Sequence, residues 1–129
     1  MKVSSPSGVQ ENFSMSFEVN TSSHFEKEVK ALAKKYRSIR KDLLDLIESL
    51  EKNPFQGDEL TPGVRKIRMT ISSKGRGKSG GARVITYTII LAENEGEVYL
   101  IDIYDKADYS TVDVAIIKKI LKDMNLLSE

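Results

Sequence analysis

The spacing of apolar residues changes about halfway along the chain, and this change limits the possible folds more than any other feature. Between residues 24 and 50, apolar side chains recur every three or four residues, which is the spacing of one face of a helix. Between residues 66 and 71 they alternate with polar residues instead, as Ile67, Met69 and Ile71 show. Alternation of this kind indicates a half-buried strand.

The first half of the chain predicts two antiparallel helices. One begins near His24, after the hydroxyl-rich turn TSS, and the other begins after Ser38 and ends at NPFQG. The link between them is short enough to require a helical hairpin. The two apolar stripes consist of Phe25, Val29, Leu32, Ala33 and Tyr36 in the first helix and of Ile39, Leu43, Leu46, Ile47 and Leu50 in the second.

The second half predicts central strands. Segments 83–91 and 97–104 are nearly continuous apolar runs, and the turn AENEG between them predicts a hairpin. A short alternating segment at 14–20 predicts one more strand, and segment 111–121 predicts a final helix with Ser110 as its N-cap. The expected order is therefore β-α-α-β-β-β-α, an α+β sheet with its helices on one side.

Length and composition predict one domain that contains no metal. The chain has 129 residues, of which 40% are hydrophobic, so we expect a single domain at 14–129 and a disordered tail at 1–13. It has no cysteine and one histidine, which excludes thiolate chemistry and argues against metal sites and cofactors. It has no apolar run long enough for a signal peptide or a membrane span, so we expect a cytoplasmic protein that does not bind membranes.

Charge is segregated along the chain. The net charge is +1, yet the segment from Leu60 to Ala92 contains no acidic residue. Its basic residues are Arg65, Lys66, Arg68, Lys74, Arg76, Lys78 and Arg83. Such segregation is what a polyanion-binding face needs.

The sequence GRGKSG, within the basic segment, matches the dinucleotide-binding pattern G-x-G-x-x-G. That pattern and the P-loop both require a helix directly after the glycines, whereas a strand follows here, so nucleotide binding is not expected. Two alternatives remain, a solvated hairpin tip and a phosphate-binding loop. Lys66 and Arg68 are two residues apart on one strand and Arg83 begins its partner, so we expect the three side chains to share one face of the sheet.

Several segments resemble the HigB branch of the RelE/ParE superfamily of bacterial toxins. They are GVRKIRM, SSKGRGKSGGARVITY and VYLIDIYDKAD, together with the helical hairpin FEKEVKALAKKYRSIRKDLLDLIESLEKNP. The resemblance implies an antiparallel β-sheet with an N-terminal helical hairpin and a C-terminal helix. It also implies a toxin that cuts mRNA on the ribosome and inhibits translation. The implied partners are ribosomal RNA, a cognate antitoxin of helix-turn-helix type, and operator DNA through the antitoxin complex.

The resemblance also implies a reaction without metal, in which the ribose 2′-hydroxyl attacks the adjacent phosphate. By position in the family's motifs, Lys66 is the base or a charge-stabilising group, and Arg68 contacts the phosphate. Arg83 stabilises the transition state, and Lys106 and Tyr104 complete the catalytic set. Tyr109 is the alternative to Tyr104. Ala107 and Asp113 stand where better-known relatives have an arginine and a tyrosine, so the general acid stays unassigned.

The remaining basic residues of the segment are expected to bind ribosomal or messenger RNA. They are Arg65, Lys74, Arg76 and Lys78. Asp102 and Asp105 are expected to pair with nearby cations, and His24 to cap a helix or face solvent. Two other functions stay open: a ParE-like poison of DNA gyrase without nuclease activity, and an inactive relative that serves only as a binding protein.

Overall fold

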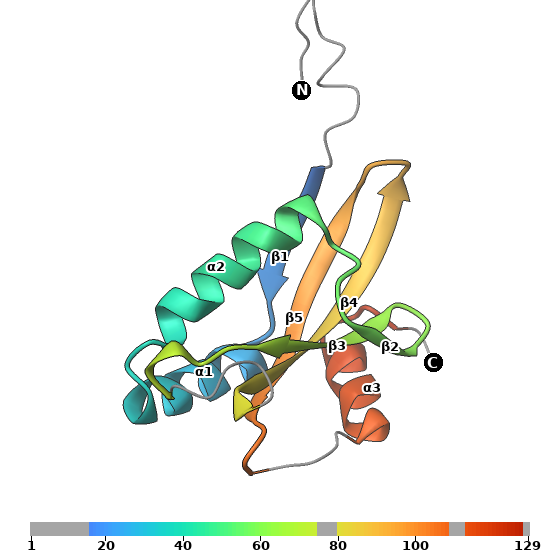
Figure 1. Cartoon of the computed structure of the whole chain (residues 1–129). Helices are drawn as coiled ribbons and strands as arrows, with labels where there is room; N and C mark the ends of the chain where they lie inside the picture. The colour runs from blue at the N-terminus through green and yellow to red at the C-terminus, as the bar shows by residue number, and fades with distance from the viewer. Residues whose placement is uncertain (1–15, 75–79, 109–112, 128–129) are drawn as a thin grey trace, which may run out of the picture.

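The computed structural model describes residues 16–74, 80–108 and 113–127 (Figure 1). The elements in these ranges are β1 (Ser16–Thr21), α1 (Ser23–Lys35), α2 (Ile39–Lys52), β2 (Asp58–Thr61), β3 (Val64–Met69), a short 3-10 turn (Ser72–Lys74), β4 (Ala82–Ala92), β5 (Glu95–Asp105) and α3 (Val114–Asp123). The predicted order is confirmed, apart from β2. The sequence of β2 is DELT, which lacks alternation and so gave no strand signal.

The five strands form one mixed sheet in the order β1-β5-β4-β3-β2. β1 runs parallel to β5, and the other neighbours are antiparallel. The expectation of a wholly antiparallel sheet is therefore wrong at one edge. The helical hairpin carries the chain from β1 to β2 at the opposite edge of the sheet. Three antiparallel pairings then bring β5 next to β1, running in the same direction.

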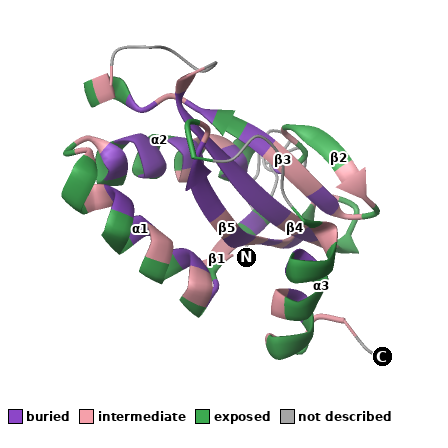
Figure 2. Cartoon of the chain, turned by 90° about the horizontal axis from the view of Figure 1, so that it is seen from below, coloured by how far each residue is buried: buried purple, intermediate pink, exposed green. Residues whose placement is uncertain are grey.

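Helices cover both faces of the sheet, which corrects the expectation that they lie on one side. α1 and α2 pack with Phe17, Val84 and Leu100 in one cluster, whereas α3 packs with Ile85 and Ile101 in a second cluster on the opposite face. Figure 2 shows the buried strands between these two layers. Coverage of both faces agrees with the nearly continuous apolar sequences of β4 and β5.

Side-chain caps begin α1 and α3, with one change from prediction. Ser22 caps α1, since its hydroxyl accepts a hydrogen bond from the Phe25 amide. α3 begins at Val114 with Asp113 as its N-cap, and the Asp113 carboxylate accepts from the Ala115 amide. The predicted cap Ser110 lies outside the described residues, as do residues 1–13. No helix within the described ranges is long and apolar enough to cross a membrane.

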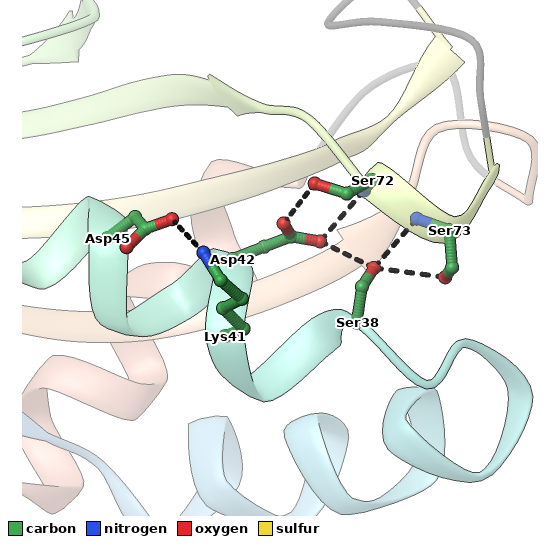
Figure 3. A network of polar contacts seen from close by, with 6 residues as sticks. All are labelled: Ser38, Lys41, Asp42, Asp45, Ser72 and Ser73. Carbon is green, nitrogen blue, oxygen red and sulfur yellow. Dashed lines mark hydrogen bonds and ion pairs between the residues drawn. The ribbon is translucent and has the colours of Figure 1, made fainter.

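Asp42 ties α2 to the turn that leads into the basic loop (Figure 3). Its carboxylate accepts hydrogen bonds from the Ser72 hydroxyl at 2.5 Å, the Ser72 amide at 2.9 Å and the Ser38 hydroxyl at 2.7 Å. The Ser38 hydroxyl in turn accepts from the Ser73 amide at 2.9 Å. Burial raises the pKa of Asp42, but these hydrogen bonds outweigh it and leave the pKa below its ordinary value.

We expect Asp42→Ala to lower the free energy of unfolding by about 1–3 kcal/mol, because it removes three hydrogen bonds that Ser38 and Ser72 donate to a buried, charged carboxylate. Asp45→Ala is the matched control, since Asp45 lies three residues on in α2, is exposed and pairs with exposed Lys41. That loss should stay below about 0.5 kcal/mol. Urea unfolding followed by circular dichroism measures both. Equal losses would show that the Asp42 network does not stabilise the fold.

Candidate functional site

Strand register brings Lys66, Arg68 and Arg83 to one face of the sheet. Arg68 on β3 lies directly opposite Arg83 on β4, and Lys66 lies opposite Ile85. Residues opposite each other across a ladder project to the same face. Because Ile85 belongs to the cluster with α3, these three cations lie on the α3 face. The expectation that they share one face is confirmed.

Tyr104 on β5 extends this row, because it lies opposite Arg83. Both are mostly buried, with 7% of Tyr104 and 5% of Arg83 exposed. Burial raises the pKa of Tyr104, and the nearby Asp102 charge adds to this effect while the Arg83 charge opposes it. Tyr104 therefore keeps its phenolic proton at neutral pH. One Arg83 N–H donates to the Ala82 carbonyl at 3.2 Å, which helps to fix the guanidinium.

Exposure rises along the row toward the edge of the sheet. β2 pairs with β3 only as far as Lys66, opposite Asp58, so Arg68 lies where no further strand covers β3 in the described part of the sheet. Arg68 is exposed and Lys66 is half-buried. The row thus offers a reachable arginine at its edge and an arginine and a tyrosine held in its interior.

Lys106 lies just beyond the paired part of β5. The last pair of the ladder joins Ala82 and Asp105, and the Lys106 amide then donates to the Gly81 carbonyl at 3.0 Å. The structure therefore places Lys106 at the start of β4, at the same end of the sheet as Arg83. Strand register does not extend to Lys106.

Arg65 does not join this group. It lies between Val64 and Lys66 on β3 and so projects to the α1–α2 face. There its guanidinium lies 5.2 Å from the centre of the Phe55 ring and 3.9 Å from a Glu59 carboxylate oxygen. Phe55 packs edge-to-face on Phe17, so Arg65 closes the end of a hydrophobic cluster.

Lys74 is also held inside the protein. Its ammonium lies 2.7 Å from Asp105, whose side chain is fully buried, and 5.3 Å from the centre of the Tyr36 ring. The Tyr36 hydroxyl donates to the other oxygen of Asp105 at 2.6 Å. The Asp105 hydrogen bond raises the pKa of Lys74, so the ammonium stays charged. Lys74 thus anchors the start of the basic loop, while Arg76, Lys78 and Tyr109 lie outside the described residues.

Asp102 pairs with the chain's one histidine. Nε2 of His24, in the first turn of α1, lies 2.9 Å from Oδ1 of Asp102. Burial raises the pKa of Asp102, and the His24 contact partly offsets the rise. Asp102 was expected to pair with a nearby cation, and its partner is the His24 imidazole. His24 itself is neither a cap nor fully exposed. No local signal predicts this contact, because 78 residues separate its partners.

The arrangement suits phosphate chemistry. Two arginines and a lysine stand at neighbouring positions on one face of the sheet. Guanidinium groups bind phosphate oxygens in pairs of hydrogen bonds. A protonated tyrosine adds a donor. Among the residues that the structure describes, no group of three or more His, Cys, Asp or Glu side chains is placed to hold a metal ion.

The buried pair predicts acid sensitivity. Lys74 and Tyr36 hold the pKa of Asp105 at about 2, below the 3.8 of an ordinary aspartate, although burial acts in the opposite direction. The stabilisation from ionised Asp105 is therefore fully present above about pH 4 and lost as the pH falls through about 2. As the pH falls from 5 to 2, the free energy of unfolding should decrease by about 2 kcal/mol more for the wild type than for Asp105→Asn. Urea unfolding of both proteins across this range measures the difference, and parallel curves would contradict it.

The candidate site is thus a row of basic and aromatic side chains on the α3 face of a mixed sheet. It is built from β3, β4 and β5, whose order and pairing the register shows. No protein-family model matches the chain. What can be said of its function therefore depends on the residues of this row and on the motifs of its sequence.

Proposed function

We propose that this protein is the toxin of a toxin-antitoxin pair, similar to the HigB branch of the RelE/ParE superfamily, and that it cuts mRNA on the ribosome. The observation that carries the proposal is the row Arg68–Arg83–Tyr104, with Lys66 on the same face. Three neighbouring strands supply these side chains. A rigid sheet holds such groups in place more firmly than a loop would.

In the proposed reaction, an RNA phosphate lies over the row. Arg83, fixed in the interior, stabilises the negative charge that develops on the phosphate as the ribose 2′-hydroxyl attacks. Arg68 holds a non-bridging oxygen from the open edge of β3. Lys66 takes the proton of the 2′-hydroxyl, or stabilises the charge that forms. Tyr104 donates a hydrogen bond to the phosphate from the β5 side of the row, and Lys106 adds positive charge at the end of β5.

Two cations outside the row, which the sequence predicted to bind RNA, have structural contacts instead. Lys74 and Arg65 are engaged with Asp105 and with Phe55 and Glu59, so their structural roles come first. Lys66 and Arg68 have no ion pair among the described residues. They are therefore available to meet phosphate. A cognate antitoxin would neutralise the toxin, and operator DNA would be reached through that complex.

Induction of the protein in bacteria, with mapping of mRNA ends, tests the function. We expect translation to stop first and new mRNA ends to appear inside translated frames, only where ribosomes translate. A gyrase poison would instead stop DNA replication, induce the DNA-damage response and leave messages intact. Intact messages in cells that stop growing would refute the nuclease.

Variants of the row locate the site. Lys66→Ala, Arg68→Ala and Arg83→Ala should each lower the cleavage rate on purified ribosomes by about 100-fold or more, the typical effect of removing a group that stabilises the transition state. Arg83 is buried, so Arg83→Lys is added, which keeps the charge and loses the paired hydrogen bonds. Arg40→Ala, at an exposed position of α2, is the control and should cleave normally. If all the row variants fold and stay fully active, the site lies elsewhere.

A further inference from the structure

The one histidine of the chain lies beside the proposed site, and none of the roles given above uses it. His24 Nε2 is 2.9 Å from Asp102 Oδ1. The side chains differ in exposure, with 39% of His24 and 16% of Asp102 accessible. The imidazole is therefore held by a largely buried carboxylate and is still open to a ligand from one side.

The end of β1 makes this contact possible. β1 pairs with β5 only as far as Thr21, opposite Leu100, so the edge of β5 beyond that point is free for the first turn of α1. The Ser22 amide donates to the Leu100 carbonyl and the Ser22 hydroxyl to the Ile101 carbonyl, both at 3.0 Å. These bonds fix the start of α1 and hold His24 at the rim of the sheet.

Asp102 lies on the same face as the proposed site. It is opposite Ile85 on β4, which is opposite Lys66 on β3. The next row along the strands is Tyr104–Arg83–Arg68. Two residues along a strand span about 7 Å, so Asp102 and the imidazole that it holds border the row that would bind the phosphate.

We propose that His24 is the general acid of the proposed RNA-cleaving site and that Asp102 is the positioning residue that orients it; this rests on the proposed function. A carboxylate accepts the Nε2 proton, which leaves Nδ1 as the atom that exchanges a proton with substrate. An Asp–His pair of this kind fixes the orientation of the ring. It also supplies the acid that the sequence motifs leave unassigned.

In the proposed step, the Lys66 amine takes the proton of the 2′-hydroxyl, and that oxygen forms a bond to phosphorus. The bond from phosphorus to the 5′-oxygen breaks, and the imidazolium of His24 donates its Nδ1 proton to the leaving oxygen. The products are a 2′,3′-cyclic phosphate and a free 5′-hydroxyl. Lys66 and His24 then return to their starting states by proton exchange with water.

Histidine suits this role because the two nitrogens of an imidazole can each hold or give up a proton. The ionisable groups around His24 are few. Asp102 contacts it and Tyr104 follows on the same face of β5, while Lys27 and Glu28 lie one turn further along α1. None of the other three contacts the imidazole through a hydrogen bond or ion pair among the described residues.

The test is a pH profile of cleavage on purified ribosomes translating a defined message, for wild type and His24→Gln. Glutamine keeps an N–H for Asp102 and cannot act as an acid. We expect cleavage by His24→Gln to be slower by about 100-fold near pH 6, since general acids contribute about 10²–10⁴-fold. The deficit should shrink as the pH rises, because a general acid acts only while it holds its proton. Lys27→Gln is the matched control on α1 and should match wild type at every pH.

The outcomes separate this assignment from the proposed function. If wild type never cleaves ribosome-bound mRNA, the nuclease proposal fails and the role of His24 falls with it. If wild type cleaves and His24→Gln has the same rate and profile, or loses activity equally at every pH, His24 is not the acid and the nuclease proposal stands.

A second measurement does not depend on the folding of a variant. Diethyl pyrocarbonate modifies imidazole, and His24 is the one histidine available to it in an untagged chain. Cleavage should fall in step with modification and return when hydroxylamine removes the group. Full activity of the modified protein would overturn the assignment. Asp102→Asn should lower the rate less than His24→Gln, because it disturbs only the orientation of the ring.

Discussion

The pairing of β4 with β5 is the interaction on which the rest of the structure depends. The central residues of both strands are covered on both faces, with Val84 and Leu100 against α1 and α2 and with Ile85 and Ile101 against α3. In a buried sheet, charged side chains need partners or a position near its end. Arg83 and Asp105 lie near one such end, where Arg83 is opposite Tyr104 and Ala82 is opposite Asp105.

The two faces at this end of the sheet receive different polar groups. On the α1–α2 face, Asp105 is paired with Lys74 and Tyr36, which closes the core and anchors the basic loop. On the α3 face, Arg83 and Tyr104 continue a row of cations toward the open edge of β3. The alternation of side chains along a strand separates these roles, because successive residues point to opposite faces. Tyr104 and Asp105 are adjacent in sequence, yet Asp105 supports the fold and Tyr104 belongs to the candidate site.

Much of the fold could be predicted from local patterns. The helical stripes ending near Tyr36 and Leu50 and the apolar runs of β4 and β5 gave their elements correctly, because periodicity reports directly on burial. β2 was missed because a short polar edge strand has no such pattern. The candidate site was predicted in part: the spacing of Lys66, Arg68 and Arg83 implied a shared face, since strand geometry alone sets it. The internal pairing of Lys74 and the approach of His24 could not be predicted, because their partners lie 31 and 78 residues away.

By itself the sequence determined where the helices and all strands except β2 form, that the chain carries a basic segment without acidic residues, and that three of its cations share one face. Those features depend on residues close together in the chain, so local physics decides them. Only the tertiary structure decided that β1 joins the sheet in parallel, that α3 covers the opposite face from α1 and α2, and which cations are neutralised. Those outcomes depend on how distant segments bury one another, and side-chain spacing along one strand carries no information about them.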